Sequence, residues 1–126
     1  MQKYQRLLIR LYTVNLAILI THEIDSAYWK EWNLFGLPGG IQFFLLVNFL
    51  LVLFFLYGLD RVIQWTSSAR LFSYALSLTG IFAFIIHMIF LMLGHEEFTL
   101  PVSLLILAAT LLISVFQIYY TARINR

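Results

Sequence analysis

The chain is a succession of long apolar stretches separated by short polar breaks. The apolar stretches cover roughly Leu7–Ile20, Ile41–Leu59, Leu71–Leu93 and Leu100–Tyr120. A helix needs about 20 apolar residues to cross about 30 Å of hydrocarbon, and the last three stretches reach or approach that length. The pattern therefore predicts transmembrane helices rather than the core of a soluble domain.

The first stretch, Leu7–Ile20, is shorter than the others and spans the bilayer only if its helix continues to about Ser26. That extension places His22 and Glu23 in the last turn of a membrane helix. A secretory signal peptide would end in small residues at a cleavage site, and no Ala-x-Ala pattern follows this stretch. We therefore interpret it as a retained first helix. The predicted helices cover about residues 5–27, 41–59, 70–94 and 100–121 of a single integral membrane domain, residues 1–126.

The composition agrees with a membrane protein. Apolar residues make up 62% of the chain and charged residues 11%, whereas soluble domains use roughly 25% charged residues. The predicted fold is all-α, a four-transmembrane-helix bundle in contact with the lipid bilayer. The chain has no cysteine, which excludes disulfides and thiolate chemistry.

The basic residues predict which way the bundle faces. Seven of the eight lie at the two ends of the chain or in the second polar break: Lys3, Arg6, Arg10, Arg61, Arg70, Arg123 and Arg126. By the positive-inside rule, both termini and the break over Gly58–Arg70 face the cytoplasm of a bacterial-type inner (plasma) membrane. The net charge of +2 then reflects contact with anionic lipid and not a nucleic-acid partner. A homo-oligomer or a second membrane protein stays open as a partner.

The acidic residues gather on the opposite, outward face. Five of the six lie in the first and third polar breaks: Glu23, Asp25, Glu31, Glu96 and Glu97. His22 and His95 lie in the same breaks, and His87 lies roughly 9 Å below the outward end of its helix at 1.5 Å per residue. Ionisable residues at membrane depth are costly and are therefore candidates for function.

Helical periodicity places several of these residues on inward faces. Asn15, His22 and Ser26 share one stripe of the first helix. Gly80 lies on nearly the same stripe as His87, and small residues let helix backbones approach closely in lipid, so His87 is expected to face a neighbouring helix. If the first and third long helices touch, we expect His22 and His87 to meet at the outward end of the bundle. Glu23 or Asp25 and one of His95, Glu96 or Glu97 are expected to converge there with them.

The last predicted helix carries a polar stripe within about 40° on a helical wheel. Its members are Ser103, Thr110, Ser114, Gln117 and Thr121. Hydrogen bonding between helices is the ordinary role of such residues in a membrane, and a water-filled path is the alternative. In either case the stripe marks the inward face of this helix.

The histidines and carboxylates of the outward face predict a polar site. The candidate metal ligands are His22, Glu23, Asp25, His87, His95 and Glu96. Glu31 and Glu97 are interpreted as ordinary loop charges. Imidazole and carboxylate donors together suit zinc and other first-row divalent ions. The preferred hypothesis is therefore a divalent metal site, with zinc as the candidate ion, at the extracytoplasmic end.

Two other functions stay open on the sequence. One is a membrane enzyme that acts on a lipid or isoprenoid substrate, with His22 or His87 as the base and a carboxylate as the acid. This hypothesis predicts a lateral opening between helices, with the aromatic segment Tyr28–Trp32 as a lid. The other is a non-catalytic accessory subunit of a larger membrane complex, in which the polar contacts only fix helix packing.

Two short motifs resemble small bacterial four-span membrane families of unknown function. One runs from His22 to Ser26 at the end of the first helix, and the other runs from Gly94 to Phe98 after the third. The chain is also loosely similar to His-x-x-Glu-Glu membrane proteins, although His95 directly precedes the paired glutamates here. The resemblance implies a four-span membrane protein and no particular activity.

Overall fold

The computed structural model describes residues 2–124, which form five helices and no strand. The helices are α1 (Gln2–Tyr28), α2 (Glu31–Leu34), α3 (Gly40–Ile63), α4 (Ala69–Met92) and α5 (Pro101–Arg123). All except the four-residue α2 are long and apolar enough to cross a membrane, with mean hydropathies between 1.4 and 2.3. The prediction of an all-helical protein with four membrane-length helices is confirmed.

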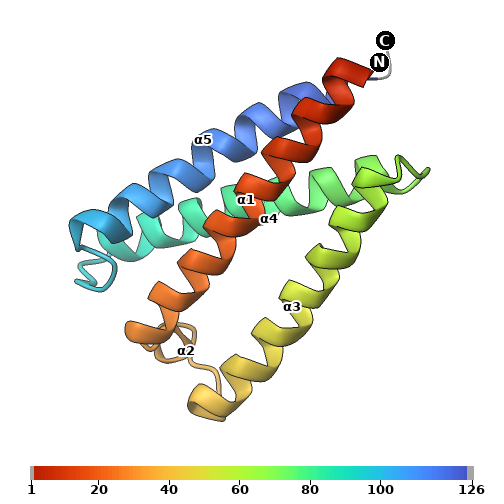
Figure 1. The fold of residues 1–126 in the computed structure, drawn as a ribbon. Coiled ribbons are helices and arrows are strands. Elements are labelled where there is room, and N and C mark those ends of the chain that lie inside the picture. Colours follow the sequence, from red (N-terminus) through yellow and green to blue (C-terminus); the bar gives the residue numbers. More distant parts are fainter. Residues whose placement is uncertain (1, 125–126) are drawn as a thin grey trace.

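The long helices alternate in direction, so the bundle has two distinct ends (Figure 1). The start of α1, the end of α5 and the α3–α4 loop lie at one end, which we call the terminal end. The short helix α2 and the α4–α5 loop lie at the other, which we call the α2 end. The breaks that carry most of the acidic residues therefore share the α2 end. Of the predicted cytoplasmic basic residues, Arg126 lies outside the described residues.

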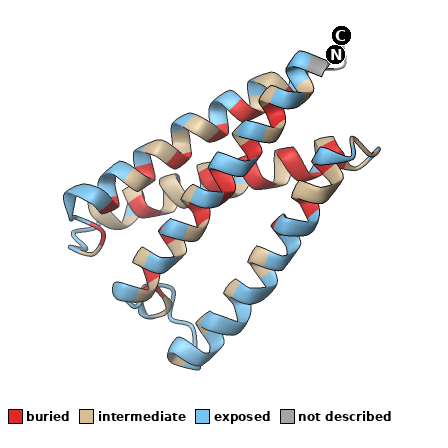
Figure 2. Ribbon diagram, in the orientation of Figure 1, coloured by how far each residue is buried: buried red, intermediate tan, exposed pale blue. Residues whose placement is uncertain are grey.

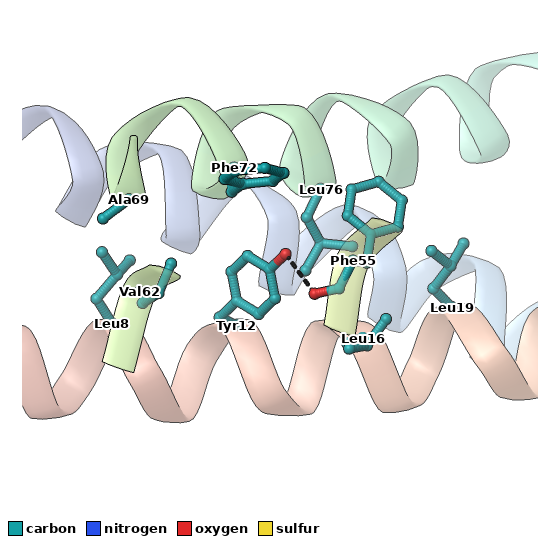
Figure 3. Close-up of a cluster of buried hydrophobic side chains, with 9 residues drawn as sticks. All are labelled: Leu8, Tyr12, Leu16, Leu19, Phe55, Val62, Ala69, Phe72 and Leu76. Atoms are coloured by element: carbon teal, nitrogen blue, oxygen red, sulfur yellow. Dashed lines mark hydrogen bonds between the residues drawn. The ribbon is translucent and has the colours of Figure 1, made fainter. Parts of the chain in front are cut away.

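A cluster of buried apolar side chains joins α1, α3 and α4 (Figure 3). Its members are Leu8, Tyr12, Leu16, Leu19, Phe55, Val62, Ala69, Phe72 and Leu76. The Tyr12 hydroxyl donates a hydrogen bond of 2.9 Å to the backbone carbonyl of Phe55. Gly58 permits this approach, because a Cβ there would lie 2.6 Å from the Phe72 ring and closer still to the Tyr12 hydroxyl.

The α3 helix is the least covered of the long helices. Only 6% of its most apolar 18-residue segment is buried, against 28% or 33% in the other three long helices. In Figure 2, exposed residues cover most of α3. Figure 1 shows that α3 and α4 meet at their connecting loop and diverge toward the α2 end. The close approach at Gly58 therefore holds one part of α3 against the bundle, while its other end stands apart from α4.

A network of polar side chains joins α1, α4 and α5 inside the bundle. All members of the α5 stripe are buried: Ser103, Thr110, Ser114, Gln117 and Thr121. The Gln117 amide donates to the backbone carbonyl and the hydroxyl of Ser73 at 3.0 and 3.1 Å. Gln117 also accepts a hydrogen bond of 2.9 Å from the Asn15 amide. The predicted inward orientation of the stripe is confirmed, and three of its members, Ser114, Gln117 and Thr121, form hydrogen bonds to other helices.

Candidate metal centre

Two histidines and one glutamate converge at the α2 end of the bundle. His22 comes from α1, Glu31 from α2 and His87 from α4. The Nε2 atoms of the two rings are 3.1 Å apart, and His87 Nε2 is 3.3 Å from Glu31 Oε1. One ligand atom of each residue lies within 4.8 Å of the other two. The three residues are 2%, 8% and 1% exposed, so the group is buried.

The two histidines reach this point because each lies on a buried helical stripe. On α1, Asn15, His22 and Ser26 are all buried, as their shared face requires. On α4, Gly80 and His87 are both buried and lie about two turns apart. The predicted meeting of His22 and His87 is therefore confirmed.

A sharp turn between α1 and α2 brings Glu31 to the histidines. Lys30 has φ 52° and ψ 52°, a left-handed conformation that is uncommon for a residue with a Cβ. The turn before it is tied by Trp29, whose indole nitrogen donates to the Asp25 carboxylate at 3.2 Å. Glu31 begins α2 directly after Lys30 and places its carboxylate beside His87. The interpretation of Glu31 as an ordinary loop charge is wrong.

Phe98 covers the site from the α4–α5 loop. Its ring stacks on that of His87 with centroids 4.2 Å apart and planes at 28°. It also lies 5.8 Å from the ring of His22. Phe98 is 1% exposed, although its φ of 66° lies in the left-handed region. A bulky residue keeps this conformation only where the surrounding packing holds it. An aromatic ring therefore shields the donor atoms from water.

Several polar atoms around the group have no partner in the protein. Among residues 2–124, both ring Nδ1 atoms, in His22 and His87, lack a hydrogen-bond partner, and so do Ser26 Oγ and Asp25 Oδ2. Burial raises the pKa of the Glu31 carboxyl above its ordinary value; the nearby Ser26 side chain partly opposes this rise, and the negative charge of Asp25 adds to it. The two histidines therefore meet through their Nε2 atoms, and the atoms without a partner lie around that contact.

Nearly the whole chain, residues 8–124, matches the family described as "Family of unknown function (DUF6713)". The chain belongs to this family. The matched residues include all three members of the convergent group. Neither a curated protein nor a solved structure matches the chain. Membership of DUF6713 agrees with the resemblance to families of unknown function, and the similarity to His-x-x-Glu-Glu proteins stays a prediction.

Two other predicted ligands in this DUF6713 chain lie on α1, next to the convergent group but turned to other partners. Asp25 accepts the hydrogen bond from Trp29. Glu23 lines two cavities together with Asn48 of α3. Neither residue belongs to the set of ligand atoms around His87, which among the described residues contains His22, Glu31 and His87.

The remaining two predicted ligands lie in the α4–α5 loop. The Nδ1 atom of His95 is 3.6 Å from the carboxylate of Glu97, and both side chains are substantially exposed. Glu96 is exposed as well. The structure therefore separates the six predicted ligands into a buried histidine pair and four residues outside the convergent group.

Proposed function

We propose that the protein binds a divalent first-row metal ion through His22, Glu31 and His87, with zinc as the best match to these donors. The convergence of one ligand atom from each of three buried residues, all within 4.8 Å, carries the proposal. Two imidazoles and one carboxylate form one of the three-ligand sets of catalytic zinc sites, which leave the fourth position to water or substrate. The same set also suits Fe(II), so the experiment must identify the metal.

The spacing of the donor atoms supports a small tetrahedral ion. Two ligand atoms about 2.0–2.1 Å from zinc, at a tetrahedral angle, lie roughly 3.3 Å from each other. The separation between His22 Nε2 and His87 Nε2 is 3.1 Å, and that between His87 Nε2 and Glu31 Oε1 is 3.3 Å. His87 therefore lies at ligand-to-ligand distance from both of its neighbours.

A bound cation also accounts for the buried acceptors better than helix packing alone does. A single proton between the two Nε2 atoms satisfies one lone pair, whereas a metal ion satisfies one from each of the three residues. This difference favours metal binding over the hypothesis in which His22, Glu31 and His87 only fix helix packing.

Metal analysis of the purified protein tests the proposal. We expect about one equivalent of metal per chain in the wild type, measured by inductively coupled plasma mass spectrometry. His22→Ala, His87→Ala and Glu31→Gln should lose most of it, because each removes one ligand. His95→Ala is the matched control, since His95 is an exposed histidine at the same end of the bundle; it should keep the metal.

Two results would contradict the proposal. One is a wild type that contains far less than one equivalent after purification in metal-supplemented buffer. The other is equal metal content in the wild type and in His22→Ala and His87→Ala. Circular dichroism and size-exclusion profiles of each variant show whether a lost metal reflects a lost ligand or a lost fold.

We also propose that the α2 end faces away from the cytoplasm of a bacterial-type inner membrane, with both termini cytoplasmic. The basic residues at the terminal end support this orientation. The cysteine-free chain allows a direct test, because Glu96 and Ser67 are exposed in the loops at opposite ends. Glu96→Cys should react with a membrane-impermeant maleimide in intact cells, and Ser67→Cys only after permeabilisation. The reverse result would overturn the orientation.

A further inference from the structure

Two cavities lie beside the proposed metal site and share part of their lining. The first, of about 240 Å³, lies between α1, α3 and α4 and has His22 and Glu31 in its wall. The second, of about 420 Å³, lies between α1 and α3. Glu23, Phe44 and Asn48 line both. Ligand pockets are typically about 300–1,000 Å³ and mostly apolar, with a few placed polar groups, and the two cavities together have this character.

The first cavity opens sideways, toward the space that lipid occupies. It exists because α3 is held close at Gly58 and diverges from α4 toward the α2 end (Figure 1). Two of its lining residues, Leu37 and Phe82, are 46% and 62% exposed. A molecule dissolved in the hydrocarbon layer can therefore enter the cavity that His22 and Glu31 line without crossing the α4–α5 loop.

The polar groups of the cavities are few and lie along one wall. His22 and Glu31 are two of the three proposed metal ligands, and Glu23 and Asn48 are part of the lining of both cavities. The Asn48 side-chain oxygen is buried and has no hydrogen-bond partner. The rest of the lining is mainly aliphatic and aromatic. The shape therefore fits an amphiphile with a coordinating head and an apolar chain.

We infer that these cavities admit an acyl lipid from the membrane, with its carbonyl or carboxylate oxygen on the open position of the metal. The inference rests on the proposed metal site. Two neutral imidazoles and one carboxylate leave one positive charge of a divalent ion uncompensated, which favours an anionic or strongly polarised oxygen as the fourth ligand. An acyl group carries such an oxygen at the end of a chain that the apolar walls accept.

Photolabelling of the metal-loaded, full-length protein tests the inference. One probe is palmitic acid with a diazirine in its chain, and the other is a phosphatidylcholine that carries the same chain. We expect peptide mapping to find the label on α3 and α4 residues that line the cavities, between Phe44 and Leu51 or between Thr79 and Ile86. Labelling by the first probe identifies a free fatty acid as the ligand, and labelling by the second identifies an esterified acyl chain.

A pair of matched variants separates the cavity from the general lipid-facing surface. Ala83→Trp fills the first cavity from α4, and Ala108→Trp adds the same side chain to the exposed face of α5. We expect Ala83→Trp to lower cavity labelling at least about tenfold while Ala108→Trp leaves it unchanged. Removal of the metal by a chelator should also lower it about tenfold or more, because a charge-assisted contact to the head is lost.

The outcomes distinguish this inference from the proposed function because metal content is measured on the same samples. A metal-loaded wild type whose label falls on α5 or is spread evenly over the helices overturns the lipid assignment and leaves the metal site standing. A cross-linked second copy of the chain in the cavity overturns it as well. A wild type without metal overturns the proposed function and the lipid assignment together. The mapping uses the wild type, so it holds even if Ala83→Trp fails to fold.

Discussion

Two buried polar regions of this protein differ in how they satisfy their hydrogen-bonding groups. In the network between α1, α4 and α5, Gln117 bonds to Ser73 and Asn15, and Asn15 also donates to Ser114 at 3.1 Å. Thr110 Oγ1 is the exception in this region, because it has no partner in the described part of the chain. At the α2 end, both histidine Nδ1 atoms, the Ser26 hydroxyl and one Asp25 oxygen lack partners among the same residues.

The difference indicates what each region is for. The network pairs an amide or a hydroxyl on one helix with an acceptor on the next, which fixes helix packing in an apolar surrounding. The histidine pair brings two lone-pair atoms to 3.1 Å and adds a buried carboxylate at 3.3 Å. This convergence fits the proposed metal site. Variants in the two regions should therefore change different properties.

The largest expected effect is on metal affinity. We expect His87→Ala to weaken metal binding by more than about 100-fold, because loss of a ligand should exceed the 10–100-fold cost of losing an outer-shell partner. Gln117→Leu should bind metal as tightly as the wild type does. Competition with a chromophoric chelator measures both affinities. Equal weakening in the two variants would show that the two regions are not separate.

The next effect is on stability. A Cβ at Gly80 would lie 3.0 Å from Thr110 Oγ1 and closer still to Ser114 Oγ. Gly80→Ala should therefore lower the free energy of unfolding by about 1–3 kcal/mol, the usual cost of overpacking. Ala108→Val, on the exposed face of α5, should change it by less than about 0.5 kcal/mol. Denaturant titration in micelles measures both. An unchanged midpoint for Gly80→Ala would mean that α4 and α5 can separate freely.

The pH dependence of metal binding tests the buried carboxylate. The metal needs ionised Glu31, and a proton competes with it below the carboxyl pKa, which burial raises. Affinity should therefore fall as the pH drops through this raised pKa, by up to about tenfold per pH unit beyond the histidine contribution. Glu31→Gln should bind the metal weakly, and its affinity should lack the part of the pH dependence that comes from the carboxyl group. An identical pH slope in the wild type and Glu31→Gln would exclude Glu31 as a ligand.

The smallest expected effect is the loss of stability when a hydrogen bond of the network between α1, α4 and α5 is removed. Gln117→Leu removes hydrogen bonds to Ser73 and Asn15, and contacts of this kind average about 0.6 kcal/mol and reach about 1.7 kcal/mol in membrane proteins. We expect a loss of stability in this range by the same denaturant titration. A much larger loss of stability would mean that the network contributes more to the free energy of unfolding than ordinary hydrogen bonds between membrane helices do.

Part of the candidate site follows from helical periodicity, and part does not. The stripe on α1 and the small residue below His87 on α4 place both histidines on inward faces. Glu31 gives no such signal, because α2 has only four residues and shows no period. Its position depends on the left-handed turn at Lys30, and a lysine is not a residue from which such a turn is expected. Glu23 lies next to His22 on α1, so the sequence favours it over Glu31 as a ligand. In the structure, however, Glu23 lines the cavities beside α3.

The sequence by itself determined the four membrane-length helices and the inward faces of α1, α4 and α5. It could do so because uninterrupted apolar runs and the cost of exposing polar groups to hydrocarbon are local properties that every residue carries. The tertiary structure alone decided that Glu31 joins the histidines and that α3 leaves an opening beside them. Those outcomes depend on contacts between residues far apart in the chain, above all the close approach of Gly58 to Tyr12 and Phe72. No local pattern encodes where two helices touch and where they diverge.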